Sequence, residues 1–170
     1  MYTEIITEYS HSQKHRHPLD NPTVTKRGVN PSCSDDIFLS LKIENDVIEN
    51  ISILGEGCAI SQASASIMAD LAEGKTVDEA KRLIKKFTGM IKKEVTDKNE
   101  PEELGDAAAF ENISKMPARV KCAVLSWHTL EEAITILKLN IKQNKMPIRK
   151  ASCLSYQFQA HASYKKGFFN

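Results

Sequence analysis

The feature that most constrains the fold is a change of hydrophobic period within one short region. Apolar residues alternate with others in two runs, 37–43 and 47–54, on either side of Glu44-Asn45-Asp46. Alternation is the pattern of a half-buried strand, and two such runs around a short polar turn predict a β-hairpin. After Gly57 the apolar residues recur at helical spacing instead. We therefore expect the hairpin to lead directly into a helix.

Helix signals dominate the rest of the chain. Thr76 with Glu79 forms a capping box that opens a second helix, and Thr129 with Glu132 has the same pattern. Pro117 suits the first turn of another helix. The other elements we expect are a helix over residues 2–9, a short strand over 23–27, a helix end at Gly74 and a short helix over 104–113. Strands first and helices afterwards predict an α+β domain, with a small antiparallel sheet of about three strands and helices packed on one face.

The distribution of charge and hydropathy disfavours some classes of partner. From Lys138 to Asn170 there are seven Lys or Arg and no Asp or Glu, which leaves 23 − 7 = 16 basic against 22 acidic residues in 1–137, a net charge of −6. An acidic body disfavours nucleic-acid binding, because phosphate contacts dominate that affinity. No apolar run approaches the roughly 20 residues that cross a bilayer. Because the first residues lack an apolar signal segment, we expect a cytoplasmic protein, in which disulfides are rare.

Three cysteines lie at positions where a reactive thiol is expected. Cys33 precedes the first strand of the predicted hairpin and Cys58 follows the second, so the two should be close although 58 − 33 = 25 residues apart. Cys58 also lies at the expected start of a helix, whose N-terminal partial charge favours a thiolate. Cys122 follows Arg119 and Lys121 near another helix start. Cationic neighbours there again favour the thiolate.

These thiols, with a nearby carboxylate, allow several interpretations. Asp35 follows Cys33 by two residues, and three thiolates with one carboxylate suit tetrahedral Zn²⁺. The chain contains no C-x-x-C pair, so ordinary partly buried cysteines are an alternative. A catalytic cysteine with a histidine base is disfavoured, because no histidine has an inferable position beside Cys33. We expect solvated loop side chains at His11, His15 and His17, a structural or surface role for His128, and a free thiol at Cys153.

The segments around the cysteines resemble a known family. NPSCSDDI, GEGCAISQASASIM and ARVKCAVLSWHTL are similar to the three cysteine motifs of SufU-type proteins, a branch of the U-type iron–sulfur cluster assembly family. The opening YTEIITEY followed by HPLDNP is similar to the start of that family. The resemblance covers about residues 2–138, in order and without large gaps. It divides the chain into a SufU/IscU-like domain over 1–138 and a basic C-terminal extension over 139–170.

The resemblance implies a function as well as a fold. It implies a Zn²⁺ ion held by Cys33, Asp35, Cys58 and Cys122. It implies a PLP-dependent cysteine desulfurase of the SufS type as partner, and downstream Suf cluster-assembly proteins as further partners. Proteins of this type act as sulfurtransferase-like carriers, accepting persulfide sulfur on a cysteine. The position that matches the acceptor is Cys33.

Two features separate this chain from related patterns. The IscU branch, which builds transient [2Fe–2S] clusters, has a His before the last Cys, where this chain has Lys121. That difference favours sulfur transfer with zinc. The alternatives are an iron–sulfur scaffold and a zinc-stabilised interaction domain without chemistry. The family also has Gly between the first Cys and the Asp, where this chain has Ser34. If that position needs a positive φ, serine costs about 1 kcal/mol.

Overall fold

The computed structural model describes residues 2–93 and 103–142, and side chains over 4–93 and 103–139. The chain divides into two compact units, Met1–Thr135 and Ile136–Asn170. The first contains the sheet and the candidate site. Of the second, only residues 136–142 are described, and they continue the last helix. Cys153 therefore lies outside the described residues. None of the described helices is both long and apolar enough to span a membrane.

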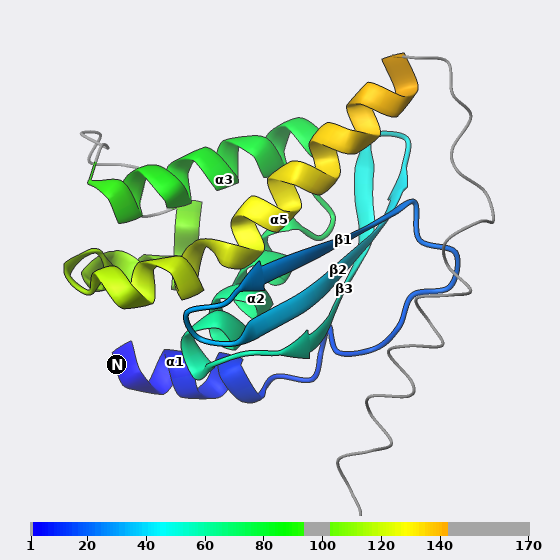
Figure 1. Cartoon of the computed structure of the whole chain (residues 1–170). Coiled ribbons are helices and arrows are strands. Elements are labelled where there is room, and N and C mark those ends of the chain that lie inside the picture. Colours follow the sequence, from blue (N-terminus) through cyan, green and yellow to red (C-terminus); the bar gives the residue numbers. More distant parts are fainter. Residues whose placement is uncertain (1, 94–102, 143–170) are drawn as a thin grey trace, which may run out of the picture. The chain divides into compact units, whose positions relative to one another are not determined.

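A three-stranded antiparallel sheet with strand order β1-β2-β3 organises the first unit (Figure 1). The strands are β1 (Val24–Asn30), β2 (Asp35–Glu44) and β3 (Val47–Glu56). The helices are α1 (Tyr2–His11), α2 (Ala59–Ala72), α3 (Val77–Lys92), the 3-10 helix η1 (Gly105–Lys115) and α5 (Pro117–Lys142). Buried residues alternate with partly exposed ones along most of β2, so the core lies on one face of the sheet. The α+β fold and its three-stranded antiparallel sheet are confirmed.

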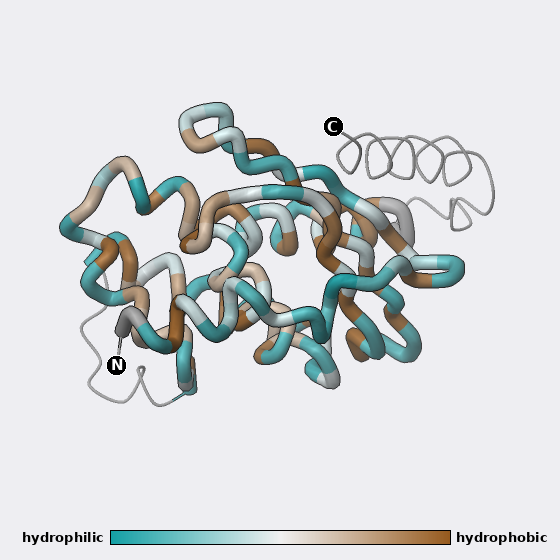
Figure 2. The backbone as a smooth tube through the Cα atoms, turned by 90° about the horizontal axis from the view of Figure 1, so that it is seen from below, coloured by the Kyte–Doolittle hydropathy of each residue, from teal (hydrophilic) through white to brown (hydrophobic). Residues whose placement is uncertain are grey.

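The hydropathy of the chain follows this arrangement. In Figure 2 the hydrophobic segments lie mainly where the tube packs against itself, and the projecting turns are mostly hydrophilic.

The short helix expected over 104–113 is present as η1, a 3-10 helix rather than an α-helix. Its buried residues are Ala107, Phe110 and Ile113, so it contributes apolar side chains to the core.

The predicted hairpin is formed by β2 and β3. Glu44 pairs with Val47, which leaves a two-residue turn in which Asn45 and Asp46 have φ values of 50° and 65°. Two positive φ values make the type I′ turn, whose twist matches that of the flanking strands, and Asn and Asp tolerate that conformation. At its other end the hairpin brings the start of β2 beside the end of β3, which is where the cysteine positions were expected to meet.

Helices α2 and α3 begin in different ways. Cys58 is the N-cap of α2, with extended backbone angles, and Gly74 follows the helix end with a φ of +78°. Thr76 caps α3. Its side chain accepts from the Glu79 backbone N–H, and the Glu79 carboxylate accepts from the Thr76 backbone N–H at 2.8 Å. The capping box predicted at this position is confirmed.

The second predicted capping box is wrong. Helix α5 begins at Pro117, as expected, and continues without a break to Lys142. Thr129 therefore lies within the helix, where its hydroxyl donates to the Leu125 carbonyl oxygen at 2.8 Å. A T-x-x-E sequence forms a capping box only at a helix start, and inside a helix the threonine hydroxyl bonds a backbone carbonyl instead. Because residues 118–142 contain no Gly or Pro, nothing in this stretch favours a new helix start.

Small residues on α2 allow α5 to pack closely against it. Ser64 lies on a buried stretch of α2, and its hydroxyl donates to the Ala123 carbonyl oxygen of α5 at 2.5 Å. The same hydroxyl accepts from the indole N–H of Trp127 at 3.1 Å. The indole stacks on Phe87 of α3, with ring centroids 4.2 Å apart and planes 8° from parallel. These contacts fix α5, and with it Cys122, against the rest of the core.

The prediction of a solvated side chain at His15 is also wrong. His15 is 3% exposed, and its ring nitrogens lie 2.8 Å from Asp70 Oδ1 and 3.3 Å from the Ile51 carbonyl oxygen. The His15 carbonyl oxygen accepts from the backbone N–H of Ile53 at 2.8 Å. Composition suggested a solvated loop, but the segment has polar partners on α2 and β3 that sequence spacing does not reveal. His11 and His17 are exposed.

Asp70 should make stability depend on pH. Burial alone raises the pKa of Asp70, but hydrogen bonds from Lys14 and His15 outweigh it, so the pKa lies below its ordinary value. A carboxylate with a lowered folded-state pKa contributes stability above its unfolded pKa of about 3.9, and that stability is lost as the pH falls through the folded value. We expect Asp70→Asn to be less stable than wild type at neutral pH. That difference should shrink in acid.

The measurement is the free energy of unfolding by denaturant as a function of pH for wild type, Asp70→Asn and Asp20→Asn. Asp20 is an exposed loop residue and serves as the control, which should follow wild type throughout. If the difference in unfolding free energy between wild type and Asp70→Asn stays constant down to low pH, the role assigned to Asp70 is contradicted.

Candidate metal centre

The four residues singled out from the sequence come from four different segments. Cys33 lies in the loop between β1 and β2, Asp35 is the first residue of β2, Cys58 is the N-cap of α2, and Cys122 lies in the second turn of α5. One ligand atom from each, the three Sγ atoms and a carboxylate oxygen, all lie within 4.8 Å of one another. The structure therefore brings together the whole predicted set.

The cluster has a buried side and an open side. Asp35 and Cys122 are 0% exposed, whereas Cys33 and Cys58 are partly exposed. Cys33 is carried by a loop, and Cys58 is the N-cap of α2. A molecule approaching from solvent therefore meets these two thiols first.

Asp35 is held by donors on both of its oxygens. The backbone N–H of Cys58 donates to Oδ1 at 2.8 Å, and the side-chain amide of Asn30 donates to Oδ2 at 2.8 Å. Asn30 also donates to Cys122 Sγ at 3.3 Å. Asn30 was not predicted as a site residue, although it opens the motif NPSCSDDI. The strand expected over 23–27 extends to Asn30 in the structure, so the only signal was its closeness in sequence to Cys33 and Asp35.

The donor set fits a tetrahedral zinc ion. With Zn–S bonds of about 2.3 Å and Zn–O bonds of about 2.1 Å, neighbouring ligand atoms lie roughly 3.5–3.8 Å apart. The observed spread of at most 4.8 Å needs only small side-chain rotations to reach that geometry. A cation here would also supply the charge partner that a fully buried carboxylate such as Asp35 requires.

Arg119 on α5 interacts with all three cysteines of the cluster, including the expected Cys122. Burial raises the pKa of the Cys122 thiol above its ordinary value, and hydrogen bonds within the cluster add to the rise. The charge of Arg119 interacts with Cys122 as well as with Cys33 and Cys58, so at Cys122 it opposes the effect of burial, and the expected effect of Lys121 there stays a prediction. Arg119 places Nη1 3.7 Å from Cys33 Sγ. The pKa of Arg119 is raised, chiefly by the charge of Cys33.

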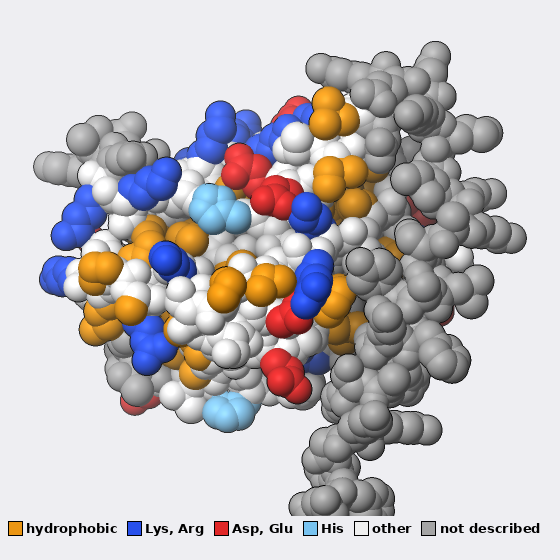
Figure 3. Space-filling model, in the orientation of Figure 1, with side chains coloured by type: hydrophobic (Ala, Val, Ile, Leu, Met, Phe, Trp, Pro, Cys, Tyr) orange, Lys and Arg blue, Asp and Glu red, His pale blue; other side chains and the backbone are white. Residues whose placement is uncertain are grey.

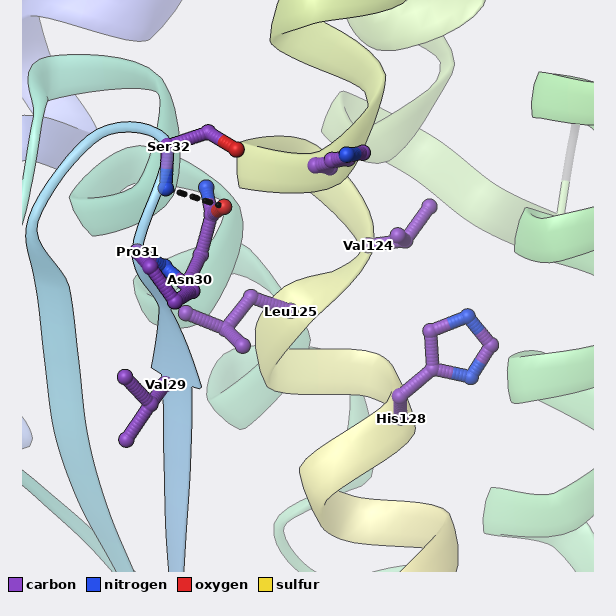
Figure 4. Close-up of a pocket in the computed structure, with 8 residues that line it drawn as sticks. Val29, Asn30, Pro31, Ser32, Val124, Leu125 and His128 are labelled. Atoms are coloured by element: carbon purple, nitrogen blue, oxygen red, sulfur yellow. Dashed lines mark hydrogen bonds between the residues drawn. The ribbon is translucent and has the colours of Figure 1, made fainter.

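A shallow groove lies beside the Cys33 loop (Figure 4). It has a volume of about 290 Å³ and is lined from the end of β1 and the next loop by Val29, Asn30, Pro31 and Ser32, and from α5 by Lys121, Val124, Leu125 and His128. Lys121 therefore lines the groove, and it is not part of the ligand cluster. On the face drawn in Figure 3, acidic, basic and hydrophobic side chains are interspersed.

Ser34 has the conformation that the family glycine suggested. Its φ is 55°, in the left-handed region, where a side chain costs about 1 kcal/mol. We expect Ser34→Gly to raise the free energy of unfolding by up to about 1 kcal/mol, because relief of this strain exceeds the added freedom of the unfolded chain. Unfolding by denaturant measures this change in the free energy of unfolding. Ser32→Gly, in the same loop but without positive φ, is the control and should not stabilise.

Comparisons with known proteins show the family to which the chain belongs. The model of the family described as "NifU-like N terminal domain" matches residues 1–123. An "Iron-sulfur cluster assembly scaffold protein IscU" of Thermotoga maritima is 42% identical over 79% of this chain and 92% of its own length. A "Zinc-dependent sulfurtransferase SufU" of Bacillus subtilis is 36% identical over 79% of this chain and 89% of its own length.

A solved structure shows the same fold. The crystal structure of a SufU from Fervidobacterium islandicum, described as a putative iron–sulfur cluster assembly scaffold protein for the SUF system, superposes with a TM-score of 0.73 at 35% identity. The match covers 77% of this chain and 94% of that one. The chain therefore belongs to the NifU-like N-terminal domain family, alongside the IscU and SufU proteins of iron–sulfur cluster assembly.

Proposed function

We propose that this protein is a zinc-dependent sulfur acceptor and carrier. It receives persulfide sulfur from a SufS-type PLP-dependent cysteine desulfurase and passes it toward iron–sulfur cluster assembly. The observation that carries the proposal is the convergence of three thiols and one carboxylate, with Cys33 on the open side. Cys33, Asp35, Cys58 and Cys122 are the proposed zinc ligands.

When bound, zinc would hold the thiols as thiolates and protect them from oxidation. Cys33 is the proposed acceptor because it is partly exposed and carried by a loop. Its thiolate attacks the outer sulfur of the donor persulfide. A new S–S bond forms at Cys33, the donor S–S bond breaks, and the donor cysteine leaves as a thiolate. Arg119, 3.7 Å from Cys33 Sγ, lies where it can stabilise the anionic sulfur before and after this step.

A scaffold for a transient [2Fe–2S] cluster is the second candidate. The IscU of Thermotoga maritima, at 42% identity, is named as a scaffold protein, and three thiols with one carboxylate can also hold iron. Against this, the cluster contains none of the described histidines. The position before Cys122 is Lys121, which lines the groove instead.

The test is alanine release by a purified SufS-type desulfurase under mild reductant, with wild type, Cys33→Ala or Ser32→Ala added. Ser32 is an exposed neighbour in the same loop and is the matched control. Strong stimulation by wild type and Ser32→Ala, with none by Cys33→Ala, supports the proposal. Equal stimulation by Cys33→Ala overturns its assigned role.

Further results separate the remaining candidates. Absence of stimulation by zinc-loaded wild type, with an oxygen-sensitive charge-transfer absorbance after anaerobic addition of iron and sulfide, favours the scaffold. Absence of both favours an interaction domain. In that domain, with metal bound, Cys33 should resist alkylation as well as Cys58 and Cys122 do.

A further inference from the structure

We propose that Asn30 is a positioning residue of this metal centre. Its single amide group holds Asp35 and Cys122 together as a fixed pair, separate from the thiol of Cys33, the proposed sulfur acceptor. The inference rests on the proposed function, because it assigns different roles to ligands of the same site. It adds a residue outside the four ligands and explains how Cys33 can leave without disturbing Asp35 and Cys122.

The position of Asn30 makes both contacts possible at once. It is the last residue of β1, pairs with Asp35 across the sheet, and is 5% exposed. Nδ2 lies 2.8 Å from Asp35 Oδ2 and 3.3 Å from Cys122 Sγ. A side-chain amide carries two hydrogens on this nitrogen, so one amide can donate to both ligands.

The orientation of the Asn30 amide is fixed by a hydrogen bond to its oxygen. Oδ1 of Asn30 accepts from the backbone N–H of Ser32 at 3.3 Å. Rotating the amide by half a turn would place its oxygen against the Asp35 carboxylate and its nitrogen against a backbone donor. Both contacts would be repulsive, so the N–H groups face the ligands.

Asp35 is thereby restricted from two sides. The Cys58 backbone N–H holds Oδ1 and Asn30 holds Oδ2, and each oxygen keeps a lone pair for a metal. Hydrogen bonds of this kind orient metal ligands, and their loss typically costs 10–100-fold in metal affinity. Cys122 is tied to the same amide, so the two buried ligands move as one unit.

Cys33 is held differently. Its thiol faces the guanidinium of Arg119 at 3.7 Å, a longer contact to an exposed side chain. The Asn30 contact to Cys33 is through the backbone, where the Cys33 N–H donates to the Asn30 carbonyl oxygen at 3.2 Å. The Cys33 side chain can therefore move without breaking any bond of the Asn30 amide.

The experiment compares wild type, Asn30→Ala, Asn30→Asp and the control Ser32→Ala, without a desulfurase. Zinc affinity is measured by chelator competition, and the ligand shell by the sulfur-to-metal charge-transfer absorbance of the Co²⁺ form. Alkylation of the metal-bound proteins, resolved by peptide mass, reports which thiol is free. Asn30→Asp has nearly the same shape but presents an oxygen where the amide donates, so it tests the hydrogen bonds rather than the packing.

We expect both Asn30 variants to bind zinc about 10–100-fold more weakly than wild type and to show altered charge-transfer absorbance. In wild type and Ser32→Ala, Cys33 should be alkylated well before Cys122. In the Asn30 variants, Cys122 should approach the rate of Cys33. Wild-type affinity together with continued protection of Cys122 in Asn30→Ala or Asn30→Asp overturns the inference. That result leaves alanine release by wild type unaffected, so failure of the two proposals can be told apart.

Discussion

Replacing Trp127 by alanine should lower the free energy of unfolding by about 3–5 kcal/mol, the usual cost of deleting a large buried aromatic side chain. Trp127 is 1% exposed, stacks on Phe87 and donates its indole N–H to Ser64. These contacts join α5 to α2 and α3. Removing the ring leaves a cavity between three helices and deprives the Ser64 hydroxyl of the indole donor, although that hydroxyl still donates to the Ala123 carbonyl oxygen.

Denaturant unfolding of wild type, Trp127→Ala, Trp127→Phe and Met116→Ala measures this. Trp127→Phe keeps a ring for stacking but loses the hydrogen bond, and should fall between wild type and Trp127→Ala. Met116 is 52% exposed, so Met116→Ala should change stability by no more than about 0.5 kcal/mol. A Trp127→Ala loss below about 1 kcal/mol contradicts the central role given to this contact.

Replacing Gly55 by alanine should cost about 3 kcal/mol or more. Gly55 has a φ of +115°, and a Cβ built there would lie 2.1 Å from the backbone oxygen of Asp36 on the neighbouring strand. Backbone strain of this kind costs of order 1–3 kcal/mol, and overpacking typically costs another 1–3. The obstacle is backbone rather than a flexible side chain, so the two strands have to separate locally.

Gly74 provides the matched control for Gly55. It also has a positive φ, +78°, but a Cβ added there meets nothing within 4 Å. Gly74→Ala should therefore cost only the conformational term, about 1 kcal/mol. The difference between the two variants in unfolding experiments isolates the clash with Asp36. If Gly55→Ala and Gly74→Ala lower the free energy of unfolding equally, the close approach of the two strands at Gly55 adds nothing to the cost of the substitution.

Local features were predictable from sequence because they depend on neighbours along the chain. The hairpin follows from alternation around a polar turn, and the α3 start follows from the reciprocal bonds of Thr76 and Glu79. The meeting of Cys33 with Cys58 follows from hairpin geometry alone. The chemistry of its thiol made Cys122 a candidate ligand, but its place beside Cys33 was implied only by resemblance, because no local pattern connects a residue on α5 with the loop before β2.

The misses share a physical cause. Burial of His15 depends on Asp70, and the hydroxyl of Thr129 has a partner inside an uninterrupted helix. The role of Asn30 depends on Cys122, which is 92 residues away in the sequence. The partners of His15 and Asn30 are set by tertiary packing, and that of Thr129 by the helix continuing through it, so residue type and local spacing alone did not predict them.

The loop that carries Cys33 also limits how far its sulfur can travel. The strand pair Asn30 and Asp35 closes a hairpin loop of only four residues, 31–34. At most about 3.6 Å per residue, the Cys33 Cα can lie no farther than roughly 7 Å from that of Asp35. Such a loop cannot work as a swinging arm. Under the proposed function, the sulfur would therefore have to be delivered to Cys33 and later collected from it by partner proteins that supply the reach.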